Sequence, residues 1–169
     1  MNLTFTKCVD DREQIDEIFQ ILKLCGEDMY FRKGLSHWKT PYGLEKIEID
    51  CREKEVYLVF DKDVDEFVST FMLSQKPSSF FEDNSRSVYI SKFATKPKYS
   101  GKGLGGRCLE FIEQYAKDNK LDSLRLDVYD KSEEAVRFYT NKGFKVLYSR
   151  KTVHFEVYCM EKKLGAKAQ

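Results

Sequence analysis

The sequence has little that would indicate a membrane, an export signal or a nucleic-acid partner. No apolar run is long enough to span a bilayer, and the first residues lack the pattern of a signal peptide. The net charge is only +1, and no basic face with interleaved aromatic residues is evident. We therefore expect a cytoplasmic protein with no membrane and no nucleic-acid partner.

Histidine is scarce, and the cysteines follow no disulfide or metal-binding pattern. The five cysteines are an odd number with no C-x-x-C pair, and the two histidines lie far apart, outside any metal-binding motif. This pattern argues against a disulfide framework and against a structural zinc site. We expect no bound metal.

What the chain does have is the composition of a globular domain. Its 169 residues are 41% hydrophobic and 34% charged, which is enough to bury a core. No repeat, low-complexity segment or linker interrupts it. We expect a single domain over residues 1–163 and a polar C-terminal tail over residues 164–169.

The hydrophobic periodicity predicts a mixed order of helices and strands. Strands are expected at 2–8, 55–60, 67–75, 88–95, 121–128, 144–149 and 153–160. Helices are expected from a cap at Asp10 or Asp11 to a stop at Gly26, then over 44–51, from about 104 to 119 and over 133–142. The strand–helix–strand unit over 88–128 should place two strands in parallel. The predicted fold is α+β, with a mixed, mostly antiparallel sheet flanked by helices.

One stretch, Lys98–Arg107, holds four of the nine glycines. It opens an amphipathic helix whose apolar face carries Leu104, Cys108, Phe111, Ile112 and Tyr115. Glycine costs roughly 0.5–1 kcal/mol in a helix, so its use here indicates a need for close access to the bare first-turn N–H groups. Such a helix N-terminus suits a phosphate or pyrophosphate; the alternative is a tight turn that only starts the helix.

Gly101, Gly103 and Gly106 also satisfy the dinucleotide fingerprint G-x-G-x-x-G, with Asp127 at a suitable distance for a ribose contact. The context does not favour that interpretation, because residues 96–100 separate the strand from the first glycine. No second mononucleotide-binding half follows. A nicotinamide-dependent oxidoreductase is therefore a weak alternative.

Val88–Phe144 resembles the GNAT superfamily of acyl-CoA-dependent N-acetyltransferases. The first matching part is Phe93-Ala94-Thr95-Lys96-Pro97 followed by Ser100-Gly101-Lys102-Gly103-Leu104-Gly105. The second is Ser132-Glu133-Glu134-Ala135-Val136-Arg137-Phe138-Tyr139 followed by Gly143-Phe144. The family usually has Arg or Gln at the position of Ser100 and Asn at the position of Ser132. Lys98 can supply the missing charge, and a serine hydroxyl can cap a helix.

The resemblance implies an acyltransferase of class EC 2.3.1 that binds acetyl-CoA as co-substrate and passes its acetyl group to an amine by direct attack on the thioester. The pyrophosphate would lie at Leu104–Arg107, and the pantetheine arm would pair with the strand Phe93–Thr95. Tyr139 would stabilise the leaving thiolate. The implied coenzyme-binding residues are Phe93, Ala94, Thr95, Ser100, Gly101, Lys102, Gly103, Leu104, Gly105, Gly106, Arg107 and Ser132.

The acceptor amine, of a small molecule or of a protein, is less defined. An aromatic loop with Tyr30, Phe31 and Trp38 could form a substrate wall or could plug the core. Glu82, Asp83 and Glu156 are candidates for the general base, or ordinary surface carboxylates. A non-catalytic acyl-CoA-binding or regulatory module on the same fold is the alternative function, and a homodimer through exposed strands or the final hairpin is a further expectation.

Overall fold

The computed structural model describes residues 1–36, 38, 42–83 and 85–165. Residues 166–169 of the predicted tail lie outside this part of the chain. The backbone of Leu164 belongs to the fold, because its N–H donates to the carbonyl of Asp122 at 2.9 Å. Among the described residues, no helix is both long enough and apolar enough to cross a membrane.

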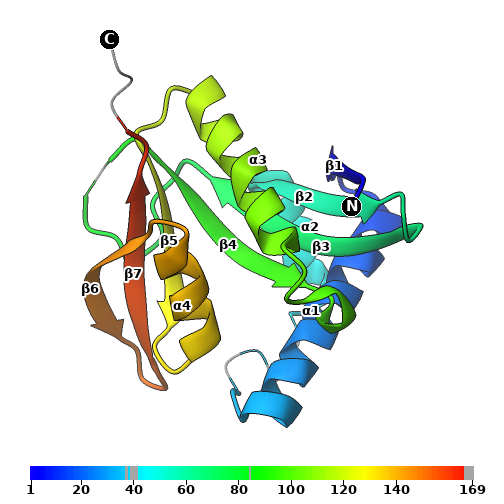
Figure 1. The fold of residues 1–169 in the computed structure, drawn as a ribbon, viewed down its shortest axis with the longest axis horizontal. Helices are drawn as coiled ribbons and strands as arrows, with labels where there is room; N and C mark the ends of the chain where they lie inside the picture. The colour runs from blue at the N-terminus through cyan, green and yellow to red at the C-terminus, as the bar shows by residue number, and fades with distance from the viewer. Residues whose placement is uncertain (37, 39–41, 84, 166–169) are drawn as a thin grey trace. The chain divides into compact units, whose positions relative to one another are not determined.

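Seven strands form a sheet with the hydrogen-bonded order β1-β2-β3-β4-β5-β7-β6 (Figure 1). Their bounds are β1 Leu3–Lys7, β2 Glu55–Asp61, β3 Glu66–Ser74, β4 Ser87–Thr95, β5 Ser123–Tyr129, β6 Lys145–Lys151 and β7 Glu156–Lys163. The pairs β1–β2, β2–β3, β5–β7 and β6–β7 are antiparallel, whereas β4 and β5 are parallel. The predicted α+β class and its parallel pair are confirmed.

The chain divides into two compact units that share β4. The first unit comprises Met1–Leu73 and Ser91–Gly105, and the second comprises Ser74–Ile90 and Gly106–Gln169. In the first unit, helices α1 (Arg12–Lys33) and α2 (Leu44–Glu53) accompany β1–β3 and the second half of β4. Its core contains Ile15, Ile18, Ile47, Leu58 and Met72, each at most 1% exposed.

Helix α1 starts as predicted but does not end as predicted. The Asp11 carboxylate caps it by accepting from the N–H of Gln14 at 3.1 Å. Gly26 is not the stop: the helix continues to Lys33, and Gly34 ends it with φ of 70°. An ideal Cβ at Gly26 would lie 2.3 Å from the carbonyl oxygen of Trp38. Gly26 therefore serves the close approach of another backbone segment.

The second unit holds most of α3 (Leu104–Asp118), helix α4 (Glu133–Asn141) and strands β5, β7 and β6. Strands β5 and β7 pair from Ser123↔Lys163 to Tyr129↔Val157 without a register shift. A hydrophobic cluster of Phe81, Tyr89, Val157 and Cys159 is buried in this unit. The predicted helices and the final strand pair are present, with ends that differ by a few residues.

Candidate coenzyme and acyl-transfer site

The segment between β4 and α3 changes direction through two left-handed glycines. After β4 ends at Thr95, Pro97–Tyr99 form the short 3-10 helix η1, and α3 begins at Leu104. Gly101 and Gly103 have φ of 73° and 85°, which only glycine adopts at little cost. An ideal Cβ at Gly101 would meet nothing within 4 Å, so the backbone there is open to an approaching group.

Gly105 and Gly106 lie in the first turn of α3, where the backbone N–H groups have no partner within the helix. An ideal Cβ at Gly106 would lie only 3.1 Å from Lys142 Nζ. Lys142 thus reaches the positive end of the α3 dipole, although two like charges repel unless an anion is present. Among the described residues Lys142 forms no ion pair with a carboxylate. Sequence analysis missed this lysine, whose one signal is its place between Tyr139 and Gly143.

The lysines near the glycine turn in the sequence differ in whether a carboxylate pairs with them. Glu66 binds both Lys96, at 3.0 Å, and Lys98, at 2.8 Å. The hydrogen bonds from Lys98 and Lys96 lower the pKa of Glu66 to about 2. Lys102 lies over the Tyr99 ring at 5.9 Å, and it is an exposed cation.

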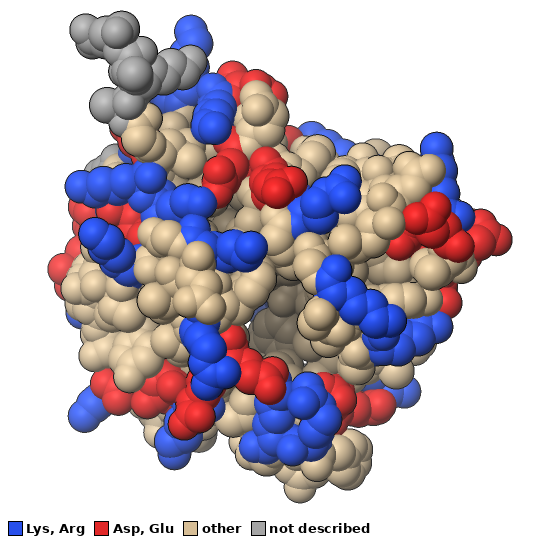
Figure 2. Space-filling model, viewed as in Figure 1, with Lys and Arg blue, Asp and Glu red and all other residues tan. Residues whose placement is uncertain are grey.

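Two further residues of the predicted coenzyme site, Ser100 and Arg107, lie before and after the glycines along the chain. Arg107 makes a loose pair with Glu110 at 3.8 Å, so its charge is weakly committed. Ser100 ends η1, and its backbone N–H donates to the carbonyl of Pro97 at 3.1 Å. On the face shown in Figure 2, Lys and Arg side chains are interspersed with Asp and Glu side chains, and neither charge dominates.

The predicted thioester strand, Phe93–Thr95, continues past the parallel pairing. The register of β4 with β5 covers Ser87↔Ser123 to Tyr89↔Arg125. Ala94 is buried, and its carbonyl accepts from the Ser69 hydroxyl at 2.8 Å, while the Phe93 ring contacts Phe71 at 5.8 Å. The side chains of this strand segment are thus held in place within the first unit.

Lys92, which sequence analysis did not single out, directly precedes this strand segment. It has φ of 45° inside β4, and its side chain is only 8% exposed. Nζ forms a short ion pair with Asp50, whose side chain is 7% exposed, and lies 4.4 Å from the centre of the Tyr42 ring. Burial lowers the pKa of Lys92, although the hydrogen bond to Asp50 opposes that shift.

Tyr139 and Ser132 belong to the second unit, as do Gly106 and Arg107. The Tyr139 ring makes edge contacts with Phe138 and Phe144 at 5.1 and 5.4 Å, and Tyr139 is half-buried. Ser132 stands at the N-cap of α4 but its side chain makes no capping hydrogen bond. Ser132 is therefore the N-cap residue by position, but the predicted capping hydrogen bond to its hydroxyl is absent.

The predicted aromatic loop is partly helical. Tyr30 and Phe31 lie in the last turns of α1, and the Phe31 side chain is 80% exposed. Trp38 packs against the core of the first unit and meets Tyr42 edge-on at 6.4 Å. For Trp38 the core-plugging interpretation fits these contacts, while residues 39–41 lie outside the described part of the chain.

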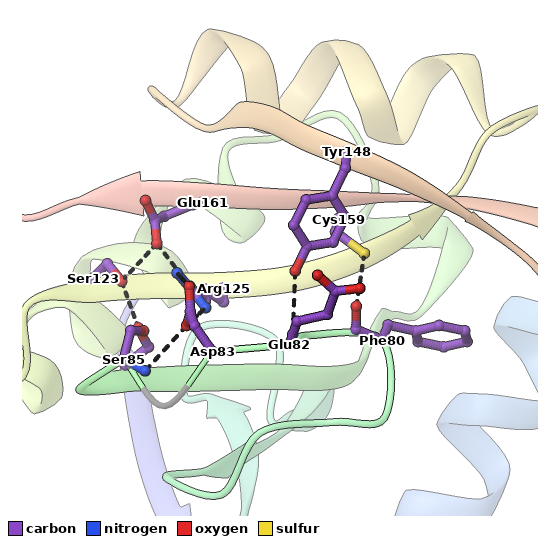
Figure 3. Close-up of polar contacts among 10 residues, drawn as sticks. Phe80, Glu82, Asp83, Ser85, Ser123, Arg125, Tyr148, Cys159 and Glu161 are labelled. Carbon is purple, nitrogen blue, oxygen red and sulfur yellow. Dashed lines mark hydrogen bonds and ion pairs between the residues drawn. The ribbon is translucent and has the colours of Figure 1, made fainter.

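Two of the three candidate bases are held in ion pairs, and Figure 3 shows the one between Asp83 and Arg125. Arg125 donates to both oxygens of Asp83, at 2.6 and 3.1 Å, and its Nε donates to Glu161 at 2.7 Å. The hydrogen bond from Arg125 lowers the pKa of Asp83, which makes Asp83 a weaker base. Glu82 is paired with Arg150 at 2.6 Å.

Four of the five cysteines are poor nucleophiles. Burial raises the pKa of Cys8 to about 12 and that of Cys25, Cys51 and Cys159 to about 11. The thiolate is the reactive form of cysteine, so these four thiols are unreactive near neutral pH. None of these four thiols is therefore suited to form an acyl-cysteine intermediate.

Comparison with known families gives the identity of this fold. The model of the Acetyltransferase (GNAT) family matches residues 15–144, more than three quarters of the chain. The chain belongs to the GNAT acetyltransferase family. Both the expected family and the expected fold are thereby confirmed, and the GNAT match includes the glycine turn and the Ser132–Phe144 segment.

Individual GNAT relatives agree with this assignment. The chain is 31% identical over 58 residues to thialysine N-epsilon-acetyltransferase of Sus scrofa, an alignment that covers 34% of each protein. The chain thus spans about a third of the length of this curated relative. Among solved structures, the ribosomal-protein-S18-alanine N-acetyltransferase from Escherichia coli has a TM-score of 0.71 and 13% identity, covering 99% of this chain and 97% of the other. A GNAT acetyltransferase from Elizabethkingia anophelis with acetyl-CoA bound has a TM-score of 0.67 and 16% identity, covering 96% and 99%.

Proposed function

We propose that this GNAT protein transfers the acetyl group of acetyl-CoA to a primary amine. The observation that carries the proposal is the backbone from Gly101 to Arg107: two left-handed glycines lead into a helix whose first turn is bare. In this proposal the pyrophosphate accepts hydrogen bonds from the N–H groups of Leu104–Arg107. Lys142 adds a cation beside Gly106.

The thioester arm lies along Phe93–Thr95 in this proposal, as an added half-strand. The amine nitrogen attacks the carbonyl carbon, a C–N bond forms, and the C–S bond breaks to release coenzyme A. A backbone N–H of the strand stabilises the developing oxyanion. The support is that β4 continues beyond its pairing with β5 and that Ser69 and Phe71 fix this segment.

The reaction needs a proton to be removed from the acceptor amine and a proton to be added to the sulfur of the leaving group. A lysine-like amine has a pKa of about 10.4, so making it neutral at pH 7 costs about 4–5 kcal/mol, and a base or water must take that proton. Since Asp83 and Glu82 are paired with arginines, Glu156 and ordered water remain as the proposed routes. Tyr139 donates a hydrogen bond to the leaving thiolate, and the second proton lost by the amine nitrogen as the amide forms converts this thiolate to the thiol.

An acceptor screen read by free thiol release tests this function. The names of two relatives point to amines of different kinds, an ε-amine and the alanine of a ribosomal protein, so the panel should hold amino acids, polyamines and peptides with free N-termini. We expect thiol release with at least one amine. In that assay Tyr139→Phe should lower kcat about 100-fold with little change in KM for acetyl-CoA.

Two controls separate the alternatives. The matched change is Tyr148→Phe, which removes the hydroxyl of a tyrosine that accepts a hydrogen bond from the N–H of Glu82 at 3.4 Å. It should leave kcat within about twofold, because this hydroxyl has no proposed role in the reaction. Calorimetric binding of coenzyme A without transfer to any amine would instead favour a non-catalytic acyl-CoA-binding module.

We also propose that the protein works in the cytoplasm as a homodimer. The five cysteines are free, as is usual in a reducing compartment. Strand β6 ends the sheet order and exposes Val146 and Leu147, which a second copy could cover. Sedimentation of the purified protein tests the dimer.

A further inference from the structure

Lys92 has a backbone conformation that its side chain does not favour. Three non-glycine residues among those described have a positive φ: Asp65, Lys92 and Lys120. Asp65 and Lys120 lie in turns, whereas Lys92 lies inside strand β4. A left-handed residue within a strand interrupts the ladder and changes the direction in which the following residues point. The residues that follow here are Phe93–Thr95.

The side chain of Lys92 is anchored at its far end. One carboxylate oxygen of Asp50 binds Lys92 Nζ, and the other lies 3.6 Å from Lys54 Nζ. The Tyr42 ring contacts the same ammonium at 4.4 Å. Asp50 is itself fixed in the last turn of α2, where its carbonyl accepts from the N–H of Lys54 at 2.8 Å.

Glycine would satisfy the backbone at this position more easily. The same chain uses glycine at positive φ four times, including Gly101 and Gly103 in the nearby turn. Lysine at position 92 therefore implies a role for its side chain. A buried ion pair is directional and expensive to break, so it can hold a residue in a conformation that its backbone would leave.

We propose that the Asp50–Lys92 ion pair is a positioning device that holds β4 in its left-handed turn at residue 92 and so aims the main chain of Phe93–Thr95. This proposal deepens the proposed acetyl transfer and rests on it, since those main-chain groups are the ones assigned to the thioester. Lys92 and Asp50 are positioning residues, and neither contacts the reacting atoms in this scheme.

Comparing two substitutions at one position tests the proposal. Lys92→Ala and Lys92→Gly remove the same charge and leave the same carboxylate, but only glycine accepts φ of 45° without strain. We expect Lys92→Ala to lower kcat about 10–100-fold, the loss typical of misplaced reacting groups, while KM for acetyl-CoA changes less than about 3-fold. Lys92→Gly should recover at least about 5-fold of that loss.

The matched control is Lys120, which has φ of 56° in the turn after α3. Lys120→Ala and Lys120→Gly should both keep kcat, because that turn is not assigned to the thioester. Equal kcat for Lys92→Ala and Lys92→Gly would overturn the proposal, since a purely structural ion pair would affect both variants alike.

A second measurement does not depend on turnover. The amide proton and nitrogen shifts of Phe93, Ala94 and Thr95 should move in Lys92→Ala and return towards the wild-type values in Lys92→Gly. Unchanged amide shifts in a folded Lys92→Ala protein would refute the positioning role whether or not the protein transfers acetyl groups. If no amine is acetylated but the shifts behave as expected, the acetyl-transfer proposal fails and the positioning of the strand stands.

Discussion

Among the residues that the structure describes, each unit buries one ion pair, and the two pairs are built differently. In the second unit, Arg125 gives three nitrogens to two carboxylates and lies on β5, which pairs regularly with β7. In the first unit, Lys92 meets one buried carboxylate from a residue with positive φ. The arginine cluster joins regular strands, whereas the lysine pair holds an irregular one. The burial of an ion pair therefore does not by itself show whether the pair stabilises the fold or orients a strand.

The pKa values of the two buried cations, Arg125 and Lys92, are shifted in opposite directions. Burial on its own would lower the pKa of Arg125, but hydrogen bonds to Asp83 and Glu161 together outweigh it and raise that pKa. For Lys92 the effect of burial is the larger one, and the pKa is lowered. Arg125 is therefore the better compensated charge of the two.

The largest expected effect tests whether the arginine cluster is purely structural. Arg125→Met would leave the buried Glu161 without its ion-pair partner, and we expect a loss of about 3–5 kcal/mol in the free energy of unfolding. Urea unfolding monitored by fluorescence and circular dichroism measures it. Any molecules that stay folded should keep their kcat, unlike those of Lys92→Ala.

Asp83→Asn is the matched change for this cluster. The Asp83 side chain is 62% exposed, so loss of its charge should cost less than about 1 kcal/mol. Equal losses for Arg125→Met and Asp83→Asn would mean that burial of Glu161 does not set the energy of the cluster.

The next largest effect comes from placing a side chain on a glycine that has a positive φ. Gly101→Ala and Gly34→Ala both place a side chain at φ near 70° in open space, and each should cost about 1–2 kcal/mol of stability. Only Gly101→Ala should also weaken coenzyme A binding, because Gly34 merely ends α1. Calorimetric titration with coenzyme A checks this, and equal affinity in both variants would remove the glycine turn from the binding site.

The smallest effect concerns an ion pair of the first unit that is nearer to solvent. Glu66 has its pKa lowered from 4.5 to about 2 by Lys98 and Lys96, so its contribution to stability is present above pH 4.5 and is lost as the pH falls towards 2. Glu66→Gln should flatten the dependence of unfolding free energy on pH in that interval. Measurements of urea midpoints from pH 2 to 7 test this, and a variant with the slope of the wild type would contradict it.

Much of the fold and the central glycine turn could be predicted from sequence because both depend on local patterns. Alternating or helical periodicity indicated the strands and helices, and the glycines and Pro97 marked the turn before α3. The exceptions depend on contacts made across the chain. Gly26 looks like a helix stop until the Trp38 backbone is seen beside it.

The parts of the site that sequence analysis missed are of the same kind. Lys92 follows a regular strand pattern, and only its φ and the distant Asp50 distinguish it. Lys142 is one lysine among many until its Nζ is found beside Gly106. Ser132 has the residue type of a helix cap but lacks the hydrogen bond, since residue type sets a preference and geometry decides.

The division of β4 between two units affects how the chain can be made. The first unit needs Ser91–Gly105, which the ribosome produces only after the segment Ser74–Ile90 of the second. Neither unit is therefore a continuous piece of sequence, and an emerging polypeptide of about ninety residues still lacks part of its first core. Splitting the gene within residues 74–90 should yield fragments that require each other to fold.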